Sequence, residues 1–272
     1  MQIEIKPQSG FQLNLKEFWS YRELLYFFTW RDIKIKYKQT FFGVLWVVLQ
    51  PLLMMIIFTA FFGRILSAHS GNIDYRVFVF AGLMLWNIFA TGIAGAGNSM
   101  VTNANIIKKI YFPRLIIPFS AVLVSLFDFL FTLVLFAGLL FYCDVTPDFG
   151  KLFLFLPLAL LITTLTTLGL GIFLSALNVK YRDFRYVIPF LVQSLLFVTP
   201  VIYPLAMIKN EFIKTLLTLN PMAAALDIFR AALTHSEINV QVVTTGFCIS
   251  LALFVIGIIT FRKTEAYFAD IA

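Results

Sequence analysis

Two stripes of aromatic and amide side chains recur at helical spacing in the apolar parts of this sequence and could form a polar surface inside lipid. The stripes contain Trp46, Gln50, Leu53, Ile57 and Phe61 in one run and Tyr186, Phe190, Gln193 and Phe197 in another. An amide that faces lipid would lack a hydrogen-bond partner, so both stripes should face protein or a wet pathway. Aromatic faces also stack on the apolar faces of sugar rings, which would suit a conduit for a glycan polymer. Ordinary helix packing in a chain with 32 phenylalanines is the competing interpretation and, from the stripes alone, the stronger one.

Charged residues near the apolar runs offer two further candidate sites. A basic cluster precedes the first run and consists of Arg31, Lys34, Lys36 and Lys38. It could bind a lipid-linked diphosphate, although topology setting and contact with anionic lipids explain it equally well. Asp128 is the only charged residue inside an apolar run, where ionised burial costs about 3 kcal/mol or more. A proton relay or a substrate contact could use Asp128, but we favour a protonated or hydrogen-bonded contact with hydroxyls such as those of the fourth run.

The sequence contains no motif for catalysis. No segment matches the phosphate-binding pattern GxxxxGKS/T, so we do not expect this chain to hydrolyse ATP. GxSxG, HExxH and paired carboxylates in a plausible cleft are also absent. The two cysteines and two histidines lack the spacing of redox or metal sites. We therefore predict no catalytic residue, no metal site and no cofactor bound by this chain.

The elements that position these residues must lie in lipid. Hydrophobic residues make up 60% of the 272 residues and charged residues 13%, and the mean hydropathy is +0.90, outside the range of soluble domains. A membrane-crossing helix needs about 20 apolar residues. Runs near that length are Gly43–Phe62, Val77–Ser99, Leu115–Tyr142, Leu152–Leu177, Val187–Tyr203 and Val240–Phe261. We therefore predict an all-α membrane protein with six transmembrane helices.

Two of these runs have distinctive residues. The fifth run is short and contains Pro189 and Pro200, which remove backbone donors and favour kinks, so it could be a broken helix. The fourth run carries a small-residue surface that lets helix backbones approach closely, which predicts a packing role. That surface consists of Thr163, Thr164, Thr166, Thr167, Gly169 and Gly171.

Segments outside the runs are expected to form interfacial helices. Leu15 to Tyr37 mixes aromatic and basic residues, which suits a helix in the membrane interface. The alternation IKIKYK could also indicate a strand, but nothing nearby supplies its partners. Residues 204–239 are too polar to span and contain two helix-like pieces that break at Asn220 and Pro221, which predicts re-entrant or interfacial helices before the last run.

The distribution of basic residues predicts the orientation. Fifteen of the 21 lysines and arginines lie in the N-terminal segment, in residues 100–114 and 178–186, and in the C-terminal tail, and the opposite loops hold six. Basic loops stay in the cytoplasm, so both termini should be cytoplasmic. Residues 1–42 then form a cytoplasmic segment with the interface helix, and residues 43–272 form one membrane domain. The net charge of +7 is accounted for by this pattern and by membrane lipids, without nucleic acid as a partner.

Five stretches, taken in order, resemble one family. They are RDIKIKYKQTFFGVLWVVLQP at Arg31–Pro51, KKIYFPR at Lys108–Arg114, LNVKYRDFRYVIPF at Leu177–Phe190, TPVIYP at Thr199–Pro204 and LNPMAAALDIFRAAL at Leu219–Leu233. The set resembles the membrane subunits of ABC exporters for O-antigen, capsular polysaccharide and teichoic acid. The resemblance covers nearly the whole chain, and the ordered set is far more specific than any single stretch.

The resemblance implies a homodimer in the bacterial cytoplasmic membrane, paired with two ATP-binding-cassette subunits that bind ATP and Mg and drive export of a lipid-linked polysaccharide. It also implies that a loop between the second and third spans docks on the ATPase. The matching residues here are Asn103, Asn105, Lys108, Lys109, Tyr111 and Phe112. By the same analogy the first and fifth spans line the channel, and the N-terminal interface helix frames the entrance for the lipid diphosphate.

Three alternatives remain open at this point. An ABC permease for drugs or lipids would share the architecture. An ion-coupled transporter would rely on Asp128 and need no ATPase. A membrane-embedded glycan enzyme is the weakest alternative, because the sequence shows no acid-base constellation.

Overall fold

The computed structural model describes residues 15–38, 43–66 and 73–265, and every regular element in these ranges is a helix. Parts of the predicted N-terminal segment and C-terminal tail, residues 1–14 and 266–272, lie outside them. The helices are α1 Leu15–Ser20, α2 Arg22–Lys38, α3 Val44–Leu66, α4 Tyr75–Thr102, α5 Ala104–Ile107, α6 Ile116–Tyr142, α7 Phe149–Lys180, α8 Phe184–Val198, α9 Glu211–Thr218, α10 Pro221–Thr234 and α11 Val240–Glu265, with a 3-10 turn at Leu205–Met207. The all-α prediction is confirmed, and the IKIKYK run is helical.

Within the described ranges, five helices are long and apolar enough to cross a membrane: α3, α4, α6, α7 and α11. They correspond to the first, second, third, fourth and sixth predicted runs. The fifth run differs, because α8 has only 15 residues and rises about 22 Å, short of a hydrocarbon core of about 30 Å. It ends at Val198, where Thr199 and Pro200 begin a turn. The predicted outer helices are α9 and α10, which meet at a bend of 90°.

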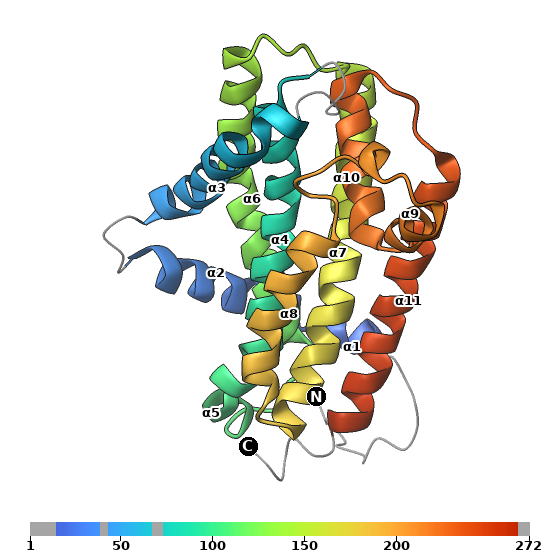
Figure 1. The fold of residues 1–272 in the computed structure, drawn as a ribbon. Coiled ribbons are helices and arrows are strands. Elements are labelled where there is room, and N and C mark those ends of the chain that lie inside the picture. The colour runs from blue at the N-terminus through green and yellow to red at the C-terminus, as the bar shows by residue number, and fades with distance from the viewer. Residues whose placement is uncertain (1–14, 39–42, 67–72, 266–272) are drawn as a thin grey trace.

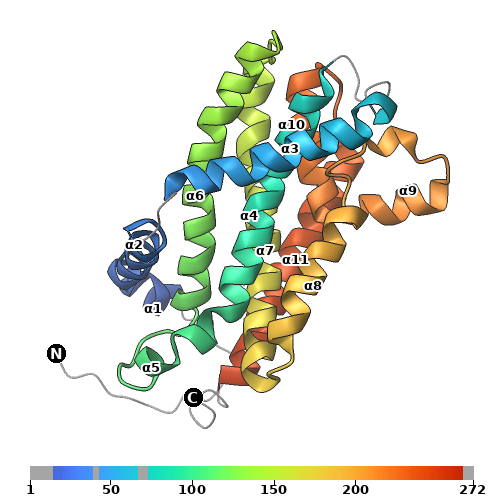
Figure 2. The ribbon, with the colours of Figure 1, turned by 60° about the vertical axis from the view of Figure 1, so that its left-hand side comes forward.

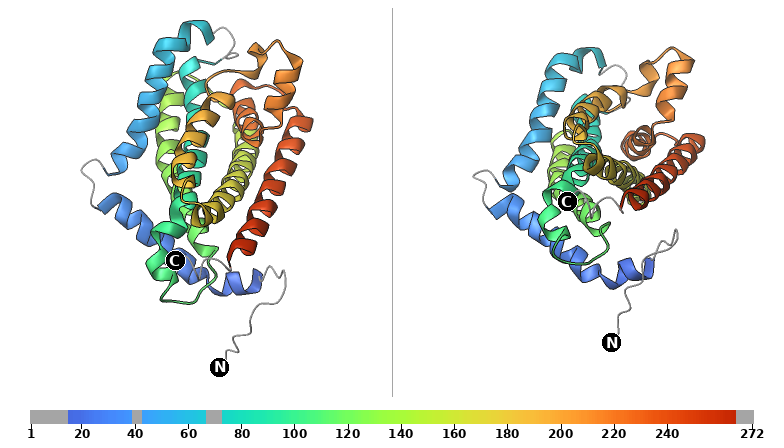
Figure 3. Two further views of the ribbon diagram at one scale, coloured as in Figure 1. Left: turned by 60° about the horizontal axis from the view of Figure 1, so that its bottom comes forward. Right: turned by 90° about the horizontal axis from the view of Figure 1, so that it is seen from below.

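Helix α4 forms the centre of the bundle, with α6 and α7 packed along it. Viewed from below, α3 and α11 lie on opposite flanks of this centre, while α2 runs along the lower edge (Figure 3). Helix α3 crosses α4 and α6 obliquely, with α2 beneath it (Figure 2). Of the most apolar window of α4, 78% is buried, compared with 22% for α3. The central helix is therefore covered within one chain, and α3 is largely uncovered.

Glycines allow the central helices to approach closely. A Cβ at Gly169 of α7 would lie 2.6 Å from the backbone carbon of Leu253 in α11, and a Cβ at Gly171 would lie 2.8 Å from the Cβ of Ala96 in α4. Real Cβ atoms do not come that close, so these positions require glycine. The predicted small-residue surface of the fourth run is thus a packing surface on two sides of α7.

Loops and helix ends that are rich in basic residues gather at one end of the bundle. Helix α5, the turn between α7 and α8, and the end of α11 all lie at the lower end in Figure 1. The turn between α6 and α7 lies at the opposite end, as does the connection from α10 to α11. This alternation fits helices that cross one layer in succession.

The chain break after α8 is held by three side chains from other elements. The Arg230 guanidinium of α10 is 7% exposed and donates to the carbonyls of Pro200 at 2.7 Å, Val201 at 2.5 Å and Phe78 at 3.2 Å. Asn220 donates to the Thr199 hydroxyl at 2.9 Å, and the Tyr75 hydroxyl donates to the Ile202 carbonyl at 2.9 Å. The bonds to Pro200, Val201 and Ile202 satisfy backbone carbonyls of the non-helical chain that follows α8.

Candidate coupling loop, helix stripes and buried ion pair

The loop between α4 and α6 is built around Asn103. This residue ends α4 and begins α5, and its side-chain amide donates to the Ser99 carbonyl at 2.8 Å. Asn103 and Phe112 are buried, at 9% and 5% exposed. Asn105, Lys108, Lys109 and Tyr111 are exposed. The six predicted coupling residues therefore divide into two that fix the loop to the bundle and four that are available to a partner.

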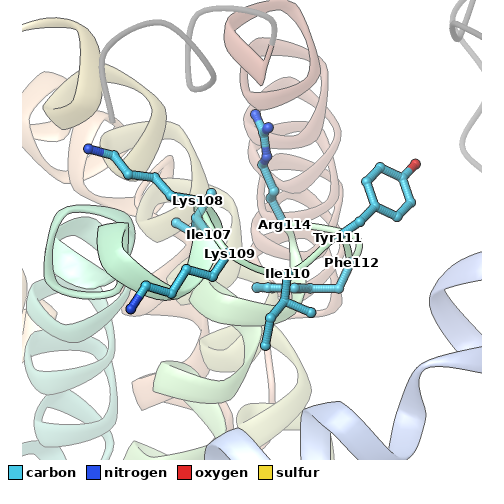
Figure 4. Close-up of a pocket in the computed structure, with 7 residues that line it drawn as sticks. All are labelled: Ile107, Lys108, Lys109, Ile110, Tyr111, Phe112 and Arg114. Atoms are coloured by element: carbon cyan, nitrogen blue, oxygen red, sulfur yellow. The ribbon is translucent and has the colours of Figure 1, made fainter.

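A hollow of about 240 Å³ lies in this loop. Its lining consists of Ile107, Lys108, Lys109, Ile110, Tyr111, Phe112 and Arg114. Figure 4 shows Lys108 and Lys109 extending to one side of the loop and the Tyr111 ring to the other, with Arg114 between them. Arg114 also donates to the Glu265 carbonyl at 2.6 Å, which ties the loop to the end of α11. The surface offers cations and an exposed aromatic ring, a combination suited to an acidic protein partner.

Helix α2 packs against this loop from the side. Phe28 is 2% exposed, and its ring centroid lies 5.5 Å from that of Phe112. The Arg31 guanidinium donates to Asn103 Oδ1 at 2.7 Å and to Asp32 Oδ1 at 2.7 and 2.8 Å. Arg31, predicted as a lipid-diphosphate contact, is thus engaged by protein groups in this structure.

The remaining members of the basic cluster point in different directions. Lys34 lies over the Trp30 ring at 5.4 Å from its centroid. Lys36 pairs with Asp128 of α6. Lys38 is exposed at the end of α2. The structure therefore places the four cations along one helix without converging them on a single point.

Asp128 lies near the midpoint of α6 and is 2% exposed. Its two carboxylate oxygens accept from the Lys36 ammonium and from the Tyr37 hydroxyl, both on α2. Burial, followed by the hydrogen bond to Asp128, raises the pKa of Tyr37, so the phenol keeps the proton that it donates.

Our expectation that hydroxyls of the fourth run would satisfy Asp128 was wrong. Thr166 and Thr167 donate to carbonyls of their own helix at 2.7 Å, and the partners of Asp128 come from α2, which packs along α6. Nothing in the sequence pattern identified Tyr37 and Phe28 as contact residues. The one signal for a partner was the charge of Asp128 itself, which required one.

All seven predicted channel-lining residues lie on surface that this chain leaves uncovered. The exposed fractions are 52% for Trp46, 75% for Phe61, 80% for Tyr186, 72% for Phe190 and 59% for Phe197, and Gln50 and Gln193 are exposed as well. The buried positions of α3 are different ones, among them Val47, Met55 and Phe58. Helices α3 and α8, which carry the two stripes, both pack on α4 (Figures 2 and 3).

The described residues include no group of three or more His, Cys, Asp or Glu side chains that could hold a metal ion. The arrangement instead offers contact surfaces: a basic loop at one end and amphipathic aromatic faces along two helices.

Comparison with known proteins identifies the family. The model of the ABC-2 type transporter family matches residues 23–234, from α2 to the end of α10. The chain belongs to the ABC-2 type transporter family. It is therefore a multi-pass membrane component of an ABC transporter, a class that works with an ATP-binding partner. Permease subunits of this class generally lack an ATPase site of their own.

Relatives of this ABC-2 type protein align over most of its length. The O-antigen export system permease protein RfbA of Klebsiella pneumoniae is 30% identical over 92% of this chain and 95% of the relative. The protein of the same name from Myxococcus xanthus is 32% identical over 80% and 82%. The polysialic acid transport protein KpsM of Escherichia coli is 23% identical over 86% and 91%.

Proposed function

We propose that this chain is the permease subunit of an ATP-driven exporter that moves a lipid-linked polysaccharide of the O-antigen, capsule or teichoic acid type across the bacterial cytoplasmic membrane. Two copies form the membrane unit, and two ATP-binding-cassette subunits hold ATP and Mg. The observation that carries the proposal is the exposure of both stripes. A single chain leaves aromatic rings and two amides uncovered along α3 and α8, although an amide in lipid requires a partner.

A second copy of the chain and a glycan would together cover the exposed aromatic rings and supply hydrogen-bond partners for the glutamine amides. Glutamine amides can exchange hydrogen bonds with sugar hydroxyls, and aromatic rings can stack on sugar faces without demanding one sequence. The relatives named for O-antigen and polysialic acid transport support a glycan polymer as the substrate. A permease for drugs or lipids is the second candidate, and loss of a surface glycan on gene deletion would decide against it.

The basic end of the bundle supports the orientation. Helix α5, the turn between α7 and α8, and the end of α11 share one end (Figure 1), and their basic residues favour the cytoplasm. The exposed loop residues Lys108, Lys109 and Tyr111 then face the compartment that holds ATP. The ion-coupled alternative is weakened because Asp128, the residue on which it relied, is already paired with Lys36 and Tyr37.

Replacing Phe190 or Trp46 with alanine should lower glycan export about two- to tenfold at normal protein levels, because an aromatic contact contributes about 0.5–1.5 kcal/mol. The measurement is the rate at which labelled glycan reaches the cell surface. Phe153→Ala is the matched control, since Phe153 of α7 is 86% exposed and lies outside both stripes. Equal export by all three variants would reject the stacking role.

Lys109→Glu should reduce recovery of the ATPase subunit with the tagged permease, because it reverses a charge on the exposed loop. Lys209→Glu is the matched control: this exposed lysine lies between α8 and α9, away from the loop. We expect the control to retain equal stoichiometry of the two chains by mass spectrometry. Loss of the ATPase in both variants, or in neither, would count against the loop between α4 and α6 as the docking site.

A further inference from the structure

Helix α2 is fixed at two separate places to two different parts of the bundle. Near its middle, Phe28 and Arg31 contact Phe112 and Asn103 of the loop between α4 and α6. At its end, Lys36 and Tyr37 contact Asp128 of α6. Arg31 and Asn103 are 72 residues apart in the sequence, and Lys36 and Asp128 are 92 residues apart. The helix therefore bridges the candidate coupling loop and the middle of a membrane-spanning helix.

The contact at Asp128 has specific geometry as well as charge. The Tyr37 ring lies 6.2 Å from the Phe127 ring and 6.1 Å from the Phe131 ring, centroid to centroid, and these two phenylalanines are one turn apart on α6. The hydroxyl of Tyr37 is thereby directed to Asp128, which lies between them in sequence. The Lys36 side chain is 39% exposed and Asp128 is 2% exposed, so separating the two would leave a buried carboxylate without its counter-charge, and the contact therefore resists separation.

The contact at the loop is equally well defined. Asn103 is simultaneously the last cap of α4 and the first cap of α5, and its two amide atoms are divided between Ser99 and Arg31. Any movement of α5 must therefore either carry Arg31 with it or break a charge-assisted hydrogen bond, which is stronger than an ordinary one.

Between the two contacts α2 is a continuous helix without glycine or proline. From Phe28 to Tyr37 it rises about 14 Å. A helix of this kind has no built-in hinge, because sharp bends occur at proline, at glycine or at bulges. A displacement of one end of α2 should therefore move the other end as well.

We propose that Asp128, Lys36 and Tyr37 form an anchor through which α2 carries movement of the coupling loop to the middle of α6. This inference rests on the proposed function, since it takes the loop to be the site on which the ATPase acts. It assigns Asp128 a positioning role: the residue holds α2 in register with α6 and does not touch substrate. The anchor links ATP hydrolysis to transport without being needed for either chain to bind the other.

The test is Asp128→Asn in the complete complex, which keeps the shape of the side chain and removes the charge that pairs with Lys36. We expect the ATPase subunit to co-purify and to hydrolyse ATP, while the amount of glycan exported per ATP hydrolysed falls about five- to tenfold, in the usual range for coupling between sites. Glu23→Gln is the matched control. It also removes one carboxylate charge, from an exposed position on α2, and should leave this ratio unchanged.

A variant in which Lys36 and Asp128 exchange their charges distinguishes a specific ion pair from a separate requirement for each residue. Lys36→Asp combined with Asp128→Lys should recover part of the export per ATP that each single substitution loses. If Asp128→Asn does not accumulate in membranes, Tyr37→Phe decides, since it deletes one hydrogen bond and keeps the ring between Phe127 and Phe131. A lowered ratio in Tyr37→Phe supports the anchor.

An unchanged ratio of glycan to ATP in Asp128→Asn, or in Tyr37→Phe where that variant decides, overturns the inference and leaves the proposed function intact. A parallel fall of ATPase binding, hydrolysis and export also overturns it, because that pattern indicates a general structural defect. Failure of the proposed function is visible without any substitution. In that case the unaltered chain purifies without an ATPase subunit, and the inference falls with it.

Discussion

Replacing Gly257 with leucine is expected to prevent stable docking of α11 on α7. A Cβ at Gly257 would overlap the carbonyl of Gly169, and a Cβ at Gly169 would in turn meet the backbone of Leu253 and Phe254. Because the obstructing atoms are backbone, no side-chain rotation can relieve the clash. Overpacking typically costs about 1–3 kcal/mol, and we expect about 3 kcal/mol or more here because a whole helix must move.

Gly138→Leu provides the matched control for this prediction. Gly138 lies in another membrane-spanning helix, α6, and a Cβ there would have no atom within 4 Å. The measurement is the fraction of each protein that remains monodisperse in detergent during a temperature series. Gly257→Leu should aggregate many degrees below both the control and the unaltered chain. Identical curves for the two variants would refute the close crossing of α7 and α11.

Residues whose role follows from local pattern could be predicted from the sequence. A run such as Val240–Phe261 must be a helix in lipid, because only helices and closed barrels satisfy the backbone there. Glycine at position 169 beside threonines predicts close packing for the same local reason. The two stripes are visible in the sequence from their spacing, but from the stripes alone ordinary helix packing was the stronger interpretation, and only the structure reveals their exposure.

The partners of Asp128 could not be predicted in this way. The sequence shows that a buried carboxylate needs a donor, but Lys36 and Tyr37 reach it only because α2 packs along α6. One of the two interpretations gave the cations of α2 a common ligand because they are close in the sequence. Helical geometry and separate tertiary contacts direct Arg31 towards Asn103 and Lys36 towards Asp128.

The end of α8 also depends on tertiary contacts that the sequence could not predict. Pro200 indicated a break in the fifth run, and the predicted run nevertheless continued to Tyr203. The structure ends the helix at Val198, because Arg230, Asn220 and Tyr75 supply hydrogen bonds to a non-helical chain from Thr199 to Ile202. The Arg230 guanidinium binds backbone carbonyls that lie 29 to 152 residues away in the sequence, so its partners cannot be inferred from local spacing.

Arg230→Met is accordingly expected to destabilise the outer half of the protein by about 3 kcal/mol or more, since each hydrogen bond to a charged group contributes about 1.5–3 kcal/mol. The substitution removes three such bonds and leaves the carbonyls of Pro200, Val201 and Phe78 buried. It also removes the guanidinium that lies 3.6 Å from the centroid of the Phe78 ring. Arg230→Lys should be intermediate, because one ammonium cannot reproduce the planar fork that reaches separate carbonyls.

Arg64→Met is the control for loss of an arginine at the same end of the bundle, since Arg64 is exposed in the last turn of α3. The half-life of the folded protein in detergent at a fixed temperature measures the effect, and Arg230→Met should shorten it far more than Arg64→Met. The position of the turn after α8 also predicts an effect on export. The freed turn begins directly after Val198, so Phe197 of the second stripe loses its fixed placement, and export should fall even in the fraction that stays folded. If Arg230→Met and Arg64→Met had the same half-life and the same export, the chain break after α8 would hold its shape without the Arg230 side chain.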